Sequence, residues 1–145
     1  LRRRLERLAQ VYSEEHGVDV ASIDGAGAAG GLAGGLAAVG GRLVEGFEVV
    51  ADEIDLWTRI EGADLVVTGE GFLDEQSFEG KVVGGVLALA EEAGVPVVAI
   101  AGEVLDEARG RIDSVSLVER FGQERAMGET TKCIEAVVAE LLSRG

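Results

Sequence analysis

Cysteine, histidine and proline are nearly missing from this sequence, which has one residue of each among its 145. The single cysteine, Cys133, permits no internal disulfide, and with His16 as the one histidine the common Cys/His zinc sites are excluded. One proline is too few for a proline-rich linker, and 47% hydrophobic residues are too many for a disordered chain. We therefore expect a globular protein, with the cytoplasm as its location.

Basic side chains are also scarce, with 13 Lys and Arg against 27 Asp and Glu and a formal net charge of -14. This charge repels nucleic acid phosphates and anionic membranes, since the only dense basic segment is residues 2–4. The longest uncharged stretch, residues 25–41, has eight glycines, which does not suit a transmembrane helix. We expect neither nucleic acid nor a membrane as partner, and an anionic substrate would need a metal ion or a local cation.

The length of 145 residues suits one sizeable core rather than two full domains. The first residues are charged and no cleavage site follows an apolar run, so no signal peptide is expected. The chain begins with Leu1 rather than methionine. We expect it to be part of a longer protein.

Hydrophobic patterns predict an α/β fold. Two β-branched runs that stop at glycine, residues 63–69 and 95–102, are typical of buried parallel strands. Between them, residues 81–93 carry a broad apolar stripe that predicts a helix, and strand, helix and strand make a right-handed βαβ unit. A third strand is predicted at 114–118, and the remaining expected helices are 1–16, 32–39, one or two within 47–60, and 130–142.

Two further segments, residues 18–23 and 47–60, carry predictions of their own. Residues 18–23 alternate weakly and suit a short strand or an extended connection. The helical spacing within 47–60 predicts core positions at Phe47, Val50, Ile54, Trp57 and Ile60.

The first candidate for chemistry is the segment 68–81, expected as a loop between the first strand and its helix. It combines flexible glycines with acids, an amide, a hydroxyl and a lysine, among them Glu70, Asp74, Gln76, Ser77 and Lys81. That mixture suits phosphoryl transfer, where positioning and charge stabilisation dominate. It is not a Walker A loop, because Val82 follows Gly80-Lys81. A solvated surface loop whose glycines only make turns is the alternative.

The second candidate is the glycine turn at residues 25–31, which matches Gly-x-Gly-x-x-Gly. Backbone N–H groups at such a turn can bind phosphate oxygens. The preceding strand is poor, and Glu45 does not end a clear second strand as a ribose-binding acid should. Close helix packing is the other explanation for these glycines.

Several separate motifs together resemble the bacterial glycerate kinase family, specifically its C-terminal portion. They are Asp24 to Gly31, Gly62 to Gly71, Asp74 to Ser77 with Gly80-Lys81, and Gly94 to Val97 with Ala101-Gly102. The resemblance covers nearly all of the chain. Phe72 departs from the pattern, since a basic residue is common there, as do Val82-Val83, where Ala-Pro is common.

The resemblance implies ATP-dependent phosphorylation of glycerate to a phosphoglycerate, with magnesium. It implies a larger two-domain α/β enzyme with a Rossmann-like parallel sheet and flanking helices. Residues 1–145 would be the C-terminal portion, with a helical and glycine-rich segment at 1–60 and an α/β segment at 61–145. By itself this portion is expected to be inactive, and assembly into a homo-oligomer stays open.

The resemblance also implies roles for single residues. Asp74 would accept the proton of the glycerate hydroxyl or bind magnesium, and Glu70 is the other acidic candidate for both roles. Lys81 would offset charge on the transferred phosphoryl group. Substrate or phosphate would be approached by Gly25, Gly27, Gly30, Gly31, Gly69 and Gly71, and oxygens oriented by Gln76 and Ser77.

Two other classes of function remain as alternatives. A dinucleotide-binding module would explain the glycine turn alone. A noncatalytic α/β interaction domain would explain the fold but neither candidate segment.

Overall fold

The computed structural model describes residues 2–79 and 81–143 and divides into two compact units, residues 1–45 and 46–145. The segments expected from the sequence instead meet at residues 60 and 61. Helices α3 (Gly46–Glu53) and α4 (Leu56–Glu61) fall in the second unit because they contact each other and α5 (Val82–Ala93). No helix within the described ranges combines the length and apolar character that crossing a bilayer requires.

The first unit consists of two helices joined by a turn. Helix α1 (Arg2–His16) ends where Gly17 takes a left-handed φ of +68°, and α2 spans Ala28–Ala38. Between them, Val20–Ser22 forms a short 3-10 helix, η1. Residues 18–23, whose weak alternation predicted a strand or an extended connection, therefore form a tight turn instead.

Glycines on α2 allow α1 to approach closely. A β-carbon built at Gly31 lies 2.9 Å from the side chains of Leu5 and Leu8, and one built at Gly35 lies 2.8 Å from the Tyr12 hydroxyl. Side chains at these two positions would displace the ends of the Leu5, Leu8 and Tyr12 side chains. Helix packing therefore favours glycine at 35, and at 31 the φ of +96° favours glycine as well.

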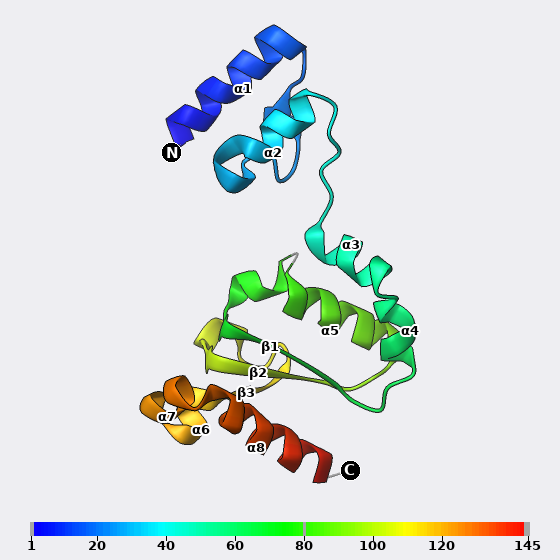
Figure 1. Ribbon diagram of the computed structural model, residues 1–145, viewed down its shortest axis with the longest axis vertical. Coiled ribbons are helices and arrows are strands. Elements are labelled where there is room, and N and C mark those ends of the chain that lie inside the picture. Colours follow the sequence, from blue (N-terminus) through cyan, green and yellow to red (C-terminus); the bar gives the residue numbers. More distant parts are fainter. Residues whose placement is uncertain (1, 80, 144–145) are drawn as a thin grey trace. The chain divides into compact units, whose positions relative to one another are not determined.

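The second unit contains a three-stranded parallel sheet in the order β1-β2-β3 (Figure 1). The strands are β1 (Val66–Leu73), β2 (Val97–Val104) and β3 (Asp113–Ser116), which confirms the predicted parallel α/β architecture. β1 continues past Gly69, its predicted end, because its last residues remain paired with β2. The predicted loop at 68–81 is therefore wrong in its first half.

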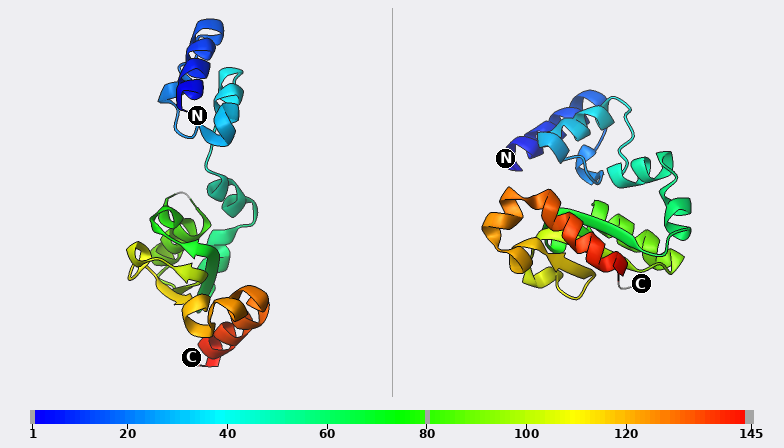
Figure 2. Two further views of the ribbon diagram at one scale, coloured as in Figure 1. Left: turned by 90° about the vertical axis from the view of Figure 1, so that its left-hand side faces the viewer. Right: turned by 60° about the horizontal axis from the view of Figure 1, so that its bottom comes forward.

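Helices cover both faces of this sheet. Helix α5 lies on one face, and Figure 2 shows α8 running along the other. The helices on the α8 side are α6 (Leu117–Phe121), α7 (Gln123–Gly128) and α8 (Thr130–Ser143). The predicted helices at 81–93 and 130–142 are confirmed, whereas no pattern predicted α6 and α7.

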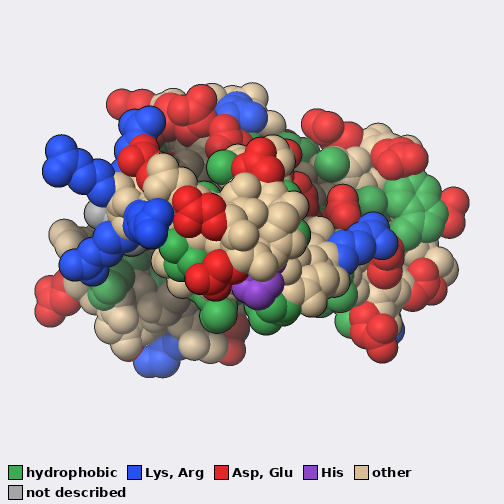
Figure 3. All heavy atoms as spheres, turned by 90° about the horizontal axis from the view of Figure 1, so that it is seen from above, with side chains coloured by type: hydrophobic (Ala, Val, Ile, Leu, Met, Phe, Trp, Pro, Cys, Tyr) green, Lys and Arg blue, Asp and Glu red, His purple; other side chains and the backbone are tan. Residues whose placement is uncertain are grey.

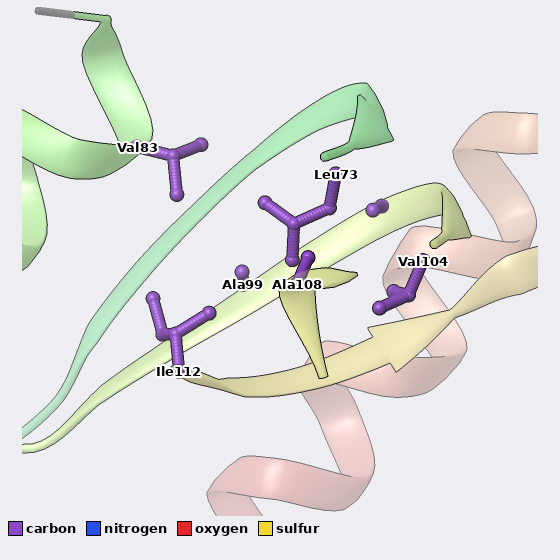
Figure 4. Packing of buried hydrophobic residues seen from close by; sticks show 7 residues of the cluster. Leu73, Val83, Ala99, Val104, Ala108 and Ile112 are labelled. Carbon is purple, nitrogen blue, oxygen red and sulfur yellow. The ribbon is translucent and has the colours of Figure 1, made fainter. Parts of the chain in front are cut away.

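Two hydrophobic clusters hold the second unit together. Neighbouring residues of β2 point to opposite faces, so that Ala99 packs toward α5 and Ile100 toward α8, as in strands buried on both sides. The cluster on the α5 side (Figure 4) is Leu73, Val83, Ala99, Ala101, Val104, Ala108 and Ile112. The cluster on the α8 side is Ile100, Leu117, Ala126, Cys133 and Val137.

The predicted core positions of α3 and α4 are wrong for three residues out of five. Val50, Ile54 and Trp57 are 58%, 46% and 36% exposed, while Phe47 is half-buried and Ile60 is buried. Helical periodicity identifies an apolar face correctly but cannot say whether a neighbour covers it. Here α3 contacts α4 and α5 and leaves the rest of that face open.

Candidate functional site

Asp74 and Ser77 form a reciprocal cap just beyond the carboxyl end of β1. Asp74 precedes a short 3-10 helix, η2 (Glu75–Phe78), and its Oδ1 accepts a hydrogen bond of 2.9 Å from the Ser77 N–H. In return the Ser77 Oγ accepts one of 3.0 Å from the Asp74 N–H. The sequence Asp-x-x-Ser determines this geometry locally, since both bonds join residues three apart.

The same serine brings a second carboxylate to this point. Ser77 is fully buried, its Oγ donates to Glu70 Oε1 in a short contact, and it lies 3.1 Å from Asp74 Oδ1. A serine hydroxyl carries one proton, so it can donate to only one carboxylate at a time. Glu70 and Asp74 are thus held on either side of one buried hydroxyl, and neither forms an ion pair within the described ranges.

The other predicted side chains of this segment point to solvent. Gln76 is exposed on η2, and Lys81 is exposed immediately before α5, in an extended conformation. Lys81 makes no ion pair with any described residue. Gly80, the other member of the Gly80-Lys81 pair, lies outside the described residues.

The carboxylates of Glu70 and Asp74 suit magnesium better than a metal that needs three or more ligands from the protein. Residues 2–79 and 81–143 contain no cluster of three or more His, Cys, Asp or Glu residues able to hold a metal. Magnesium needs less, because it is usually held by one or two carboxylates together with water and substrate phosphates. Glu70 and Asp74 could provide such a pair.

Gly69 and Gly71 lie within β1 rather than in a loop, and they differ in their surroundings. A β-carbon built at Gly69 would overlap the Ile100 carbonyl oxygen of β2, whereas one at Gly71 meets nothing within 4 Å. Across from Gly71, a β-carbon at Gly102 would lie 2.6 Å from the Gly71 carbonyl oxygen. Gly69 and Gly102 are therefore required by the close approach of two strands.

A pocket of about 690 Å³ opens on the second unit beside these glycines, and we call it the β1 pocket. Gly69, Gly71 and Gly102 lie along its sheet side, and residues of α6, α7 and α8 form the opposite side. Glu70 lines it as well. Sequence reasoning missed the pocket because α6 and α7 were not predicted. The closely spaced glycines on two adjacent strands were the available signal.

The glycine turn belongs to the first unit. Ala29, Gly30 and Gly31 have φ of +50°, +71° and +96°, so α2 becomes regular only after them. The turn follows η1 and not a strand, which removes the strand that a dinucleotide fingerprint needs. A β-carbon meets nothing within 4 Å at Gly25 or Gly30.

Comparison with known proteins identifies the family. The model of the glycerate kinase family matches residues 1–144. The chain belongs to this family. A glycerate kinase of Halalkalibacterium halodurans is 45% identical over 102 residues, which are 70% of this chain and 27% of that protein. The glycerate 2-kinase of Escherichia coli is 41% identical over 104 residues, 71% of this chain and 27% of that protein.

The family fold is matched by a solved structure. A crystal structure from Salmonella typhimurium, provisionally described as glycerate kinase 2, superposes with a TM-score of 0.56 at 29% identity, covering 94% of this chain and 39% of that one. The chain thus spans between a quarter and two fifths of the length of these glycerate kinase family relatives. The parallel α/β fold and the predicted family are both confirmed.

Removing the hydroxyl of Ser77 tests whether it organises the site. We expect Ser77→Ala to lower the free energy of unfolding by about 1–2 kcal/mol, because the Asp74 N–H and the Glu70 carboxylate lose a partner that is buried. Urea titration followed by circular dichroism measures the change. Ser143→Ala is the matched control, since the Ser143 hydroxyl is exposed and bonds only the Glu140 carbonyl. Equal stabilities of the two variants would contradict the role of Ser77.

Proposed function

We propose that this chain supplies phosphoryl-transfer residues for the ATP-dependent phosphorylation of glycerate, with magnesium as the metal, within a longer enzyme. The observation that carries the proposal is the buried Ser77 hydroxyl between the carboxylates of Glu70 and Asp74. Ligands of open parallel sheets bind beyond the carboxyl ends of the strands, where Asp74 and Ser77 lie. Membership of the glycerate kinase family supports glycerate as the phosphoryl acceptor.

Asp74 is the proposed proton acceptor. Its Oδ1 is held by the Ser77 N–H, which orients the carboxylate and leaves Oδ2 for chemistry. As the glycerate oxygen bonds to the γ-phosphorus and the bond to ADP breaks, the hydroxyl proton passes to Asp74. Ser77 itself acts as a positioning residue, since its buried hydroxyl already contacts both acids.

The negative charge of the chain means that binding of anionic substrates needs a metal ion and a lysine. The chain has a net charge of -14, and acidic side chains are spread over the face drawn in Figure 3. ATP and glycerate are both anions, so both are repelled by this field. Magnesium held by Glu70 would neutralise charge on the phosphates, while the free Oδ2 of Asp74 takes up the proton. Lys81, exposed at the start of α5, would offset charge on the transferred group.

Three further assignments belong to the same proposal. The name of the Escherichia coli relative, glycerate 2-kinase, supports transfer to the 2-hydroxyl, which would give 2-phosphoglycerate. At the glycine turn, the open space beside Gly25 and Gly30 leaves room for phosphate or substrate, with Gly27 and Gly31 shaping the turn. Gln76, exposed on η2, would orient substrate oxygens.

A chimera tests the proposed function directly. This chain would replace the matched segment of the Halalkalibacterium halodurans glycerate kinase, and phosphoglycerate formation from ATP and glycerate would be measured. We expect turnover in the chimera, and none for the 145-residue chain alone, because that chain matches only 27% of this relative. A folded chimera without turnover would contradict the proposal, as would NAD stabilising the chain in a thermal-shift assay where magnesium-ATP does not.

A further inference from the structure

The two edges of the parallel sheet differ in how well they are protected from further pairing. In the order β1-β2-β3, the outer strands each pair on one side only among the described residues (Figure 1). β3 is four residues long and begins with Asp113, and short or charged edge strands resist pairing with another strand. β1 is eight residues long and has no proline. Its one charged side chain, Glu70, is bonded to Ser77, so the β1 edge lacks these protections.

β1 has the residues of an interior strand but is not buried like one. Parallel strands are normally covered on both faces. Leu73 is the one buried residue of β1, and Val67 and Phe72 are 42% and 62% exposed. β2, which has the same length and lies in the middle of the sheet, has four buried residues: Ala99, Ile100, Ala101 and Val104. A further neighbour on the β1 side would give β1 comparable burial.

The backbone of β1 indicates that this neighbour is a strand. The Val66 N–H donates to the Pro96 carbonyl at 2.9 Å and therefore faces β2. Consecutive residues of a strand direct their N–H and C=O groups to opposite sides, so those of Val67 face the free edge. Any element that covers this edge must also pair these polar groups. A strand does so because it offers both donors and acceptors along its length.

The length of the relatives indicates where such a strand comes from. The chain matches 27% of two glycerate kinases and 39% of the solved structure, so more than half of each lies outside the matched part. We propose that, in the longer enzyme, β1 pairs along its free edge with a strand from outside residues 1–145. A second copy of this chain is a poorer partner, because each copy has a net charge of -14 and repels another. This inference rests on the proposed function, which places the chain within a longer enzyme.

The added strand would border the proposed reaction centre. Asp74 directly follows the last residue of β1, and Ser77 caps it there. A strand paired with β1 therefore ends beside these two residues. Ligands of open parallel sheets bind in a crevice between adjacent strands at this end. The free edge of β1 thus supplies one wall of the crevice, and the strand from the rest of the enzyme supplies the other.

Hydrogen exchange measured by mass spectrometry and NMR tests the pairing without relying on activity. In the 145-residue chain, the Val67 amide should exchange rapidly at any protein concentration, because it faces the free edge. In the chimera, the β1 peptide should contain roughly twice as many slowly exchanging amides, since the outward half gains partners. The β2 peptide, paired on both sides in either protein, is the internal control. The β3 peptide should gain none.

A proline at position 67 provides a second arm. Val67→Pro removes an N–H that faces the free edge, a position where a strand tolerates proline. We expect it to lower the urea midpoint of the chimera more than that of the 145-residue chain, because only the chimera loses a hydrogen bond between strands. Val67→Ala is the matched control, since it shortens the same side chain and keeps the N–H. Its effect on the chimera should be smaller.

Each outcome decides the proposal. It is overturned if β1 gains no slow amides in a folded chimera, if β3 gains them instead, or if Val67→Pro affects chimera and chain equally. Protection of Val67 in the 145-residue chain overturns it without the chimera, and protection that rises with protein concentration would assign the edge to a second copy. An inactive chimera whose β1 gains protection keeps the strand pairing and rejects the kinase. An active chimera with an unprotected β1 rejects only the pairing.

Discussion

Asp74→Asn in the chimera is expected to lower kcat by about a hundredfold to ten-thousandfold, the contribution usual for a positioned general base. Asparagine keeps an oxygen that can accept the Ser77 N–H, so the cap that begins η2 should persist. What the substitution removes is the negative charge and the ability to take up a proton. Steady-state phosphoglycerate formation, with unfolding measured in parallel, separates the loss of chemistry from a loss of fold.

The same experiment includes Lys81 and matched controls. Lys81→Ala should also reduce kcat, because the cation proposed to offset phosphoryl charge is removed. Glu75→Gln changes an exposed acid adjacent to Asp74, and Lys132→Ala changes the other lysine of the sequence, which pairs with Glu129. Both controls should keep near-normal turnover. Near-normal rates for Asp74→Asn and Lys81→Ala would reject the assigned roles.

Gly69→Ala is expected to have the largest effect on stability. Its β-carbon would overlap the Ile100 carbonyl oxygen, and because that oxygen belongs to the backbone of β2, one of the two strands must move. The expected loss is at the upper end of the range for overpacking, about 3 kcal/mol in the free energy of unfolding. Chemical denaturation of the 145-residue chain measures it.

Gly71→Ala is the matched control for that prediction, two residues along the same strand. A β-carbon at 71 meets nothing within 4 Å, and glycine is a poor strand residue, so alanine should be neutral or slightly stabilising. If Gly69→Ala and Gly71→Ala unfold at the same denaturant concentration, the strands do not approach each other as described.

The elements with a strong local pattern were predicted well. The β-branched runs before Gly69 and Gly102 form paired parallel strands, and the apolar stripes at 81–93 and 130–142 form α5 and α8. These patterns arise from residues close in the chain. A hydrophobic run of strand length, or a stripe of helical period, constrains its own conformation whatever it packs against.

The predictions that failed concern where elements end and what covers them. β1 continues through Glu70 only because β2 offers it partners, and Val50, Ile54 and Trp57 are exposed because no described element of the second unit packs over them. Neither fact is encoded in nearby residues. Helices α6 and α7 were missed for a related reason, since they are short and their burial depends on α8 and the sheet.

For the candidate site, the division between sequence and tertiary structure is clear. Residue types and spacing alone determined the α/β class, the resemblance to the family, and the cap between Asp74 and Ser77, because that cap joins residues three apart. Only the tertiary structure decided that Glu70 reaches the same hydroxyl, since this requires β1 to run on to Leu73 and η2 to fold back against it. The same holds for the β1 pocket, whose walls come from two strands and three helices distant in the chain. Contacts between distant residues depend on the packing of whole elements, and no local pattern specifies that packing.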